Sequence, residues 1–313
     1  MRLLPSSPLI FSLGPLYVPQ DEREICDQPN LEETDPQTAL ACEETAKGEA
    51  ALGLDKGIFA GYVDWLGNAI QGDFGESYKN GVPVSDTIKE KFPTSVTLMI
   101  FAQLIAFLFA IPLALIAAYR SGGWFDRVSS GASFAIISIA PFIMGLVLLF
   151  IFGVRLGWFP TLYDDGEDLV GRLRGMFLGA LTLGLGLGAV YQRLLRGDLV
   201  STLQEDYILM AKAKGMPSRR IMLKHALRPS TFSLLTVIGI QIGALIGGAV
   251  VVEVTFGIRG IGYEIVQAIF SREYQMVQAI VLLLATVFIV SNLIVDVIYG
   301  MLDPRVRDVR ALN

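Results

Sequence analysis

Charged residues are scarce in this sequence: they make up 18% of 313 residues, whereas a soluble domain usually carries about 25%. There is one histidine and there are two cysteines, so a zinc site built from these ligands is excluded. No segment has the form GxxxxGK[ST], so the chain lacks a nucleotide-binding P-loop of its own. No nucleophile with a base and a supporting carboxylate is visible either, and we expect no enzyme activity and no cofactor in this chain.

Long apolar runs lie between the few charged segments. Hydrophobic residues make up 53% of the chain and the mean hydropathy is +0.54. Five runs approach the length of about 20 residues that a bilayer requires. They cover roughly Ser95–Tyr119, Ser130–Val154, Met176–Val190 with its flanks, Phe232–Val252 and Val277–Gly300. Backbone groups in hydrocarbon must find partners within the structure, so we predict an all-α membrane protein in which Pro112 and Pro141 are possible kinks.

Basic residues fix the orientation of these spans. Eight of them lie between Arg193 and Arg228, two more lie between the first two spans, and three follow the last span. These three regions fall on one side if the spans alternate, and cytoplasmic loops are the ones enriched in Lys and Arg. A Lys or Arg at the bilayer centre costs about 2.5–3.5 kcal/mol, which opposes other arrangements. The segment 193–229 and the C-terminus are therefore predicted to be cytoplasmic, and residues 20–90 to lie outside.

The exported segment is acidic and contains both cysteines. Residues 21–50 include ten acidic residues but only two basic ones, Arg23 and Lys47. Cys26 and Cys42 share this stretch, and cysteines in an oxidising compartment are often bridged. We predict a Cys26–Cys42 disulfide, the alternative being two unrelated thiols.

The amino terminus fits neither a span nor a signal peptide. Its first 19 residues are apolar but contain Pro5, Pro8, Pro15 and Pro19, which oppose a regular helix. One basic residue, Arg2, is a poor match to a secretory signal. We hypothesise that a first span is missing or truncated. The predicted divisions are an apolar remnant at 1–20, an exported region at 21–92, a transmembrane domain at 93–303 with a cytoplasmic loop at 193–229, and a tail at 304–313.

The cytoplasmic loop contains the most specific pattern. Leu203–Lys214 is predicted to be helical, with Gly215 as its stop, because glycine adopts the left-handed conformation at little cost. Ser218 is expected to cap a second short helix that ends near Leu227. A basic inner loop would explain the charges alone, but not two helices separated by a glycine.

This loop resembles the "EAA" loop of binding-protein-dependent ABC importer permeases. Ala211, Gly215 and Leu227 match that pattern, while Leu209 and Met210 replace its first two letters. Arg228 stands where the pattern has proline, and Pro229 follows it. The form Tyr-x-x-x-Ala-x-Ala-Lys-Gly, here Tyr207–Gly215, is typical of the dipeptide/oligopeptide branch.

Other segments resemble the same branch in the same order. They are Leu52–Lys56, Gly72–Ser77, Gly248–Glu253 with Gly260–Gly262, and Asp303–Arg307. The resemblance covers residues 50–310, but residues 21–50 have no counterpart. Members of the family generally have six spans, which is a second reason to suspect a missing one.

The resemblance implies a type I ABC importer-like bundle that carries peptides, although relatives carry nickel, sugars and other solutes. The implied partners are a second permease, two ATPase subunits that hold ATP and Mg²⁺, an extracytoplasmic binding protein and the lipid bilayer, with no nucleic acid. The residues expected to couple to the ATPase are Tyr207, Ala211, Lys212, Ala213, Lys214, Gly215, Arg219, Arg220 and Leu227. The alternative is a secondary transporter or channel subunit, but we find neither internal repeats nor many buried charges.

Small and polar residues within the spans suggest further roles. Gly239, Gly243 and Gly247 recur every four residues, which permits close helix approach either within the chain or against a partner permease. Gly175/Gly179 and Gly184/Gly188 repeat the spacing. Four polar residues either line a translocation path or form hydrogen bonds between helices: Gln103, Gln192, Gln241 and Asn292. We assign Asp296 a structural role with Arg305 or Arg307, and His225 a packing or ATPase-contact role.

Overall fold

The structure is a computed structural model that describes residues 17–18, 25–26, 35–51, 58–77, 81–166 and 168–302. In these ranges the regular structure is helical, and the one pairing of extended backbone is an isolated antiparallel bridge between Glu76 and Pro83. The chain forms two compact units, one of residues 1–90 with 264–282 and the other of residues 91–263 with 283–313. The predictions for residues 1–16 and 304–313 lie outside the described residues.

The first unit contains α3 (Pro36–Ala51), α4 (Ile58–Ile70), most of α12 (Ile261–Phe270) and the start of α13 (Tyr274–Leu302). Asp35 caps α3, because its Oδ1 atom accepts from the amide of Thr38 at 3.2 Å. The hydroxyl and amide of Thr38 lower the pKa of the Asp35 carboxyl. The buried Ser77 hydroxyl donates to Glu273 Oε2 at 2.7 Å, which ties the segment after α4 to the turn before α13.

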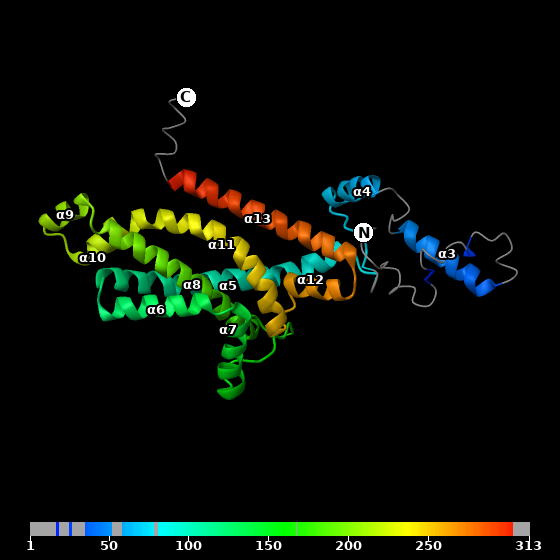
Figure 1. The fold of residues 1–313 in the computed structure, drawn as a ribbon, viewed down its shortest axis with the longest axis horizontal. Coiled ribbons are helices and arrows are strands. Elements are labelled where there is room, and N and C mark those ends of the chain that lie inside the picture. Colours follow the sequence, from blue (N-terminus) through cyan, green and yellow to red (C-terminus); the bar gives the residue numbers. More distant parts are fainter. Residues whose placement is uncertain are drawn as a thin grey trace, which may run out of the picture. The chain divides into compact units, whose positions relative to one another are not determined.

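The second unit is a bundle of long helices (Figure 1). Its elements are α5 (Val84–Tyr119) from Lys91 onward, α6 (Trp124–Ser138), α7 (Pro141–Leu148), the π-helical η3 (Leu149–Arg155), α8 (Leu169–Thr202), α9 (Asp206–Ala213), α10 (Ser218–Arg220), the π-helical η4 (Ile221–Ala226), α11 (Leu227–Phe256), the first three residues of α12 and the remainder of α13. In Figure 1, α5, α6, α8 and α11 run along one another, and α7 stands across them.

Long apolar helices confirm the predicted membrane spans. Among the described residues, four helices are long and apolar enough to cross a membrane: Val84–Tyr119, Leu169–Thr202, Ser218–Phe256 and Tyr274–Ile298. A fifth span results if the bent pair Trp124–Ser138 and Pro141–Arg155 is counted as one. Pro112 lies inside α5, which continues past it to Tyr119.

The second predicted span is not one continuous helix, which corrects the expectation for residues 130–154. Helix α6 ends at Ser138, Ile139 and Ala140 are extended, and the two parts meet at 106°. Proline disfavours the helical conformation of the residue before it, and it has no amide hydrogen to continue the ladder. Pro141 therefore begins α7 instead of kinking a longer helix.

Small residues bring α5 and α8 close together in the core. Ala102, Ala106 and Ala110 follow each other at intervals of four on α5 and are fully buried. A Cβ atom at Gly184 of α8 would lie 2.9 Å from the carbonyl oxygen of Ala102, and one at Gly188 would lie 3.2 Å from that of Ala106. Such glycines allow two backbones to pack almost directly on each other, as in other membrane bundles.

Candidate functional site

The loop at residues 193–229, which is expected to be cytoplasmic, is held in shape by a glycine-stopped helix. Gly215 has φ = +73°, in the left-handed region. Its amide donates to Lys212 O at 2.9 Å, and the amide of Met216 donates to Ala211 O at 3.3 Å. These two bonds form a Schellman motif, in which the carbonyls at the end of α9 find partners. The predicted stop at Gly215 is thus present, although α9 begins at Asp206 rather than at Leu203.

A small core of its own stabilises this loop. Ile208, Ala211 and Ile221 are buried against one another, and Leu203 and Met216 pack on them. The contact of Met216 with this core completes the Schellman motif, which is often accompanied by an apolar contact. Because it includes residues of α9 and η4, the loop is a folded body rather than a loose connection.

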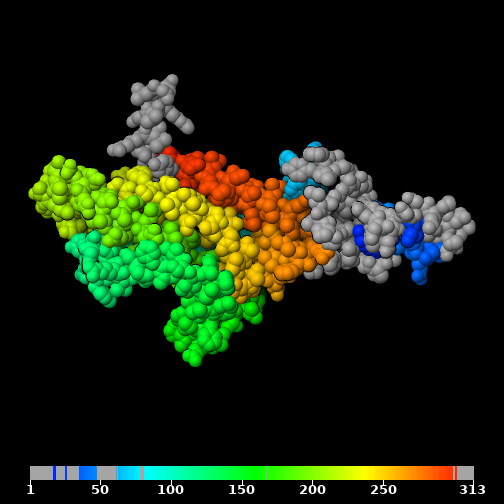
Figure 2. Space-filling view, in the orientation of Figure 1, coloured from blue at the N-terminus to red at the C-terminus, as the bar shows by residue number. Residues whose placement is uncertain are grey.

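The outer surface of the loop combines cations with apolar side chains. Lys212, Ala213, Lys214, Arg219 and Arg220 are exposed. Tyr207 and Met210 of α9 are 44% and 60% exposed. Figure 2 shows that this segment, in light green, forms the surface at one end of the second unit.

Two of the predicted coupling residues do not belong to that surface. Ala211 is 5% exposed and lies in the loop core. Leu227 is partly buried and packs on the main core of the bundle. Any effect of these two residues on a partner would act through the shape of the loop. The coupling roles themselves stay predictions.

The second helix of the loop differs from the expectation in two ways. Ser218 is not its cap, because Pro217 takes that position and no side chain caps the helix. The helix does not end near Leu227 either: α10 runs through η4 into α11, so residues 218–256 form one continuous helix. The second half of the loop is therefore continuous with a membrane span.

Long-range contacts, which the sequence pattern did not single out, anchor the base of the loop. Arg196 of α8 holds Asp126 of α6 through two hydrogen bonds, at 2.9 and 2.6 Å. The amide of Gly122 also donates to Asp126 at 2.8 Å. Tyr207 donates from its hydroxyl to His225 O at 3.4 Å, which joins α9 to η4. Partial burial raises the pKa of the Tyr207 hydroxyl. A carboxylate followed by a distant arginine was the available signal, but many such pairs exist in the chain.

The glycines of α11 are divided between two environments. A Cβ atom at Gly239 would lie 3.0 Å from Val295, and one at Gly243 would lie 2.9 Å from Phe288, both in α13. At Gly247 no atom lies within 4 Å. Gly239 and Gly243 therefore serve packing within this chain, and Gly247 is the member of the series that stays open.

Two of the intramembrane glutamines form hydrogen bonds between helices. Gln103 of α5 accepts from the Tyr191 hydroxyl at 3.2 Å, and Gln192 of α8 accepts from the Ser133 hydroxyl at 2.8 Å. Gln241 and Asn292 are partly buried, and Asp296 is exposed. Arg305 and Arg307, the expected partners of Asp296, lie outside the described residues. A role in lining a translocation path remains a prediction for Gln103, Gln192, Gln241 and Asn292.

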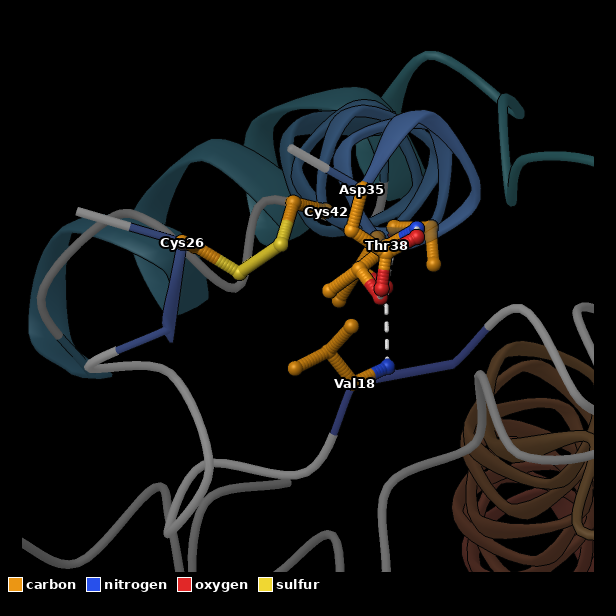
Figure 3. Close-up of a disulfide and its surroundings, with 7 residues drawn as sticks. Val18, Cys26, Asp35, Thr38 and Cys42 are labelled. Carbon is orange, nitrogen blue, oxygen red and sulfur yellow. Dashed lines mark hydrogen bonds between the residues drawn. A yellow bond between two sulfur atoms is a disulfide. The ribbon is translucent and has the colours of Figure 1, made fainter. Parts of the chain in front are cut away.

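The two cysteines are joined in the predicted disulfide, with Cα atoms 5.8 Å apart (Figure 3). The bond links Cys26 to Cys42 on α3. Nearby, the amide of Val18 donates to the buried Thr45 hydroxyl at 3.1 Å. These two contacts fasten the chain before α3 onto that helix. In the described part of the chain, no three His, Cys, Asp or Glu side chains gather as a metal site.

Comparison with known proteins identifies the family. The family model for the "Binding-protein-dependent transport system inner membrane component" matches residues 110–308. The glutathione transport system permease protein GsiC of Escherichia coli (strain K12) is 37% identical over 256 residues, which are 82% of this chain and 82% of that protein. GsiC of Shigella boydii serotype 4 (strain Sb227) matches equally.

A solved structure supports the same fold. The MetNI methionine ABC transporter in an inward-facing conformation matches with a TM-score of 0.59 at 14% identity, covering 69% of this chain and 96% of that one. It shows a type I importer-like bundle. This chain belongs to the permeases of binding-protein-dependent ABC importers, in the peptide and nickel transport branch.

Proposed function

We propose that this permease subunit translocates small peptides that an extracytoplasmic binding protein delivers. The observation that carries the proposal is the 37% identity over 82% of the chain to permeases named for glutathione transport. Glutathione is a tripeptide, so a short peptide with free carboxylates is the cargo chemistry that this similarity favours. The multi-pass chain would lie in a bacterial or archaeal cytoplasmic membrane, with residues 193–229 and the C-terminus inside and residues 20–90 outside.

Energy for transport would come from two separate ATPase subunits that bind ATP and Mg²⁺. Their contact on this chain would be the outer surface of the loop, where Lys212, Lys214, Arg219 and Arg220 are exposed beside Tyr207 and Met210. Apolar side chains supply buried area in such contacts, and charges fix their specificity. A second permease subunit, distinct or identical, would complete the pathway.

The coupling would be mechanical. Closure of the ATPases displaces the loop as a rigid body, because its two helices share the core of Ile208, Ala211 and Ile221. The displacement reaches α11 without a break, since residues 218–256 form one helix. Rigid-body motion of this kind exchanges inward-open and outward-open states through their different contacts.

Co-purification tests the proposal. The protein is solubilised gently from its native membrane, as wild type and as Arg219→Glu/Arg220→Glu. The matched control is Arg155→Glu, an exposed arginine at the end of η3, far along the chain from the loop. We expect ATPase subunits and a second permease with the wild type and the control, and loss of the ATPases with the double variant. Recovery of the chain alone, under conditions that preserve other importers, would contradict the proposal.

A further inference from the structure

A buried carboxylate joins three segments near the end of α11 that is expected to lie outside. Glu253 is 0% exposed. The amide of Tyr263 donates to Glu253 Oε2 at 2.9 Å, and the Gly262 amide and the Ser95 hydroxyl also bond to this carboxylate. The Ser95 hydroxyl in turn accepts from the amide of Ile261 at 2.7 Å. Helices α5 and α11 and the first turn of α12 therefore meet at Glu253.

The first turn of α12 is capped from other helices. The first amides of any helix lack partners within it, and a residue just before the helix usually supplies the acceptor. Here the acceptors come from Glu253, in the preceding span, and from Ser95, which is 166 residues away from Ile261 in the chain. A carboxylate is well placed there, because the start of a helix carries partial positive charge.

The segment between α11 and α12 is fitted closely around this carboxylate. Gly257 ends α11 with φ = +64°. A Cβ atom at Gly260 would lie 2.5 Å from Glu253 Oε2, and one at Gly262 would lie 2.6 Å from the Cα atom of Val250. Neither position has room for a side chain, so any larger residue would push the segment off Glu253.

We propose that Glu253 is a positioning residue, which holds α5, α11 and the first turn of α12 together as one rigid body throughout the transport cycle. This inference rests on the proposed function, since it assumes inward-open and outward-open states. The physical reason is the free-energy cost of separating the Glu253 carboxylate from its hydrogen-bond donors. Oε1 of Glu253 has no hydrogen-bond partner in the described part of the chain, so loss of the donors on Oε2 would leave a buried carboxylate wholly unsatisfied.

If these segments move together, no opening forms between α5 and α11 during transport. Hydrogen exchange of the amides of Ile261, Gly262 and Tyr263 reports this directly, because each of them donates to the carboxylate or to Ser95. The measurement uses the importer assembled with its ATPases, free of nucleotide and trapped with ATP and vanadate. We expect the same slow exchange in both states, and faster exchange in the trapped state would overturn the proposal.

Two variants distinguish the role of Glu253 from that of Ser95, and a third serves as control. Glu253→Gln keeps the length and one acceptor oxygen but loses the charge, and exchange at Gly262 and Tyr263 should become about 10- to 100-fold faster, as the strength of hydrogen bonds to charged groups implies. The rates should then also differ between the two states. Ser95→Ala should accelerate mainly Ile261. Thr255→Ala is the control, because its exposed hydroxyl bonds only to Val251 O in the same helix.

Different results would overturn the role of Glu253 and the proposed function. Unchanged exchange in Glu253→Gln would overturn the role of Glu253 even if ATPase subunits co-purify. Failure to recover ATPases would overturn the proposed function, whereas the comparison of variants on the isolated chain would still test the tie between Glu253 and the first turn of α12.

Discussion

The Nη2 atom of Arg196 lies 2.6 Å from Oδ2 of Asp126, and its Nε atom lies 2.9 Å from Oδ1. This two-point contact joins α8 to the first turn of α6, just before the chain enters the loop that contains α9. The aspartate side chain is 5% exposed and the arginine side chain 29%. Because the carboxylate is buried, loss of its partner leaves an unpaired charge, which is more costly than loss of a surface ion pair.

Arg196→Ala is therefore expected to destabilise the protein by about 1.5–3 kcal/mol, the range for hydrogen bonds to charged groups. Thermal unfolding in detergent measures the effect. The double variant Asp126→Ala/Arg196→Ala should cost less than the sum of the single variants, because the unpaired charge is then absent. Additive effects would show that the two residues act independently.

Gly215→Ala should impair coupling more than stability. The left-handed conformation costs a non-glycine residue about 1–2 kcal/mol, and relief of this strain would change the angle between α9 and α10. ATP hydrolysis by the assembled importer is expected to fall. Gly247→Ala serves as control, since nothing lies within 4 Å of its Cβ position and its backbone is helical. Equal rates of ATP hydrolysis by both variants would show that Gly215 has no particular role in coupling.

Two neighbouring glycines of α8 should respond in opposite ways to alanine. At Gly184 the new Cβ would lie 2.7 Å from Ile105 Cγ2 and 2.9 Å from Ala102 O, whereas at Gly186 nothing lies within 4 Å. Overpacking typically costs about 1–3 kcal/mol, so Gly184→Ala should lower the unfolding temperature. Gly186→Ala should leave it unchanged or raise it slightly, because alanine favours helix. A larger loss at position 186 would contradict the close packing of α5 on α8.

Whether a feature of the structure could be predicted from the sequence depends on how far apart in the chain the interacting residues lie. The spans and the stop at Gly215 follow from local properties, namely apolar length and the left-handed preference of glycine. A kink at Pro141 was foreseen as possible, but the complete break at Ile139–Ala140 was not, because proline tolerates either a kink or a new helix, and packing decides between them. The cap assigned to Ser218 failed because α10 begins one residue earlier, after Pro217. The ion pair of Asp126 and the ties of Glu253 join residues far apart in the chain, which no local pattern reveals.

Removal of the disulfide should loosen α3 without affecting the bundle. Closing a loop of about this length restricts the unfolded chain by roughly 3 kcal/mol in the chain-entropy model. Cys26→Ser/Cys42→Ser is expected to make residues 17–51 more susceptible to limited proteolysis. Fragments from α8 or α11 should appear no faster, because the disulfide lies in the other compact unit. Equal acceleration in both regions would indicate that the disulfide supports the whole chain.

The central claim is that the surface of α9 binds an ATPase subunit, and site-specific photocrosslinking in intact membranes tests it most directly. A photoreactive amino acid is placed at Met210, which is 60% exposed on α9, and at Leu162, which is 72% exposed in the segment between η3 and α8, as control. The account predicts a covalent adduct at position 210 whose peptides contain a P-loop, and no such adduct at position 162. Adducts with lipid alone at both positions, or an ATPase adduct at position 162 only, would contradict it.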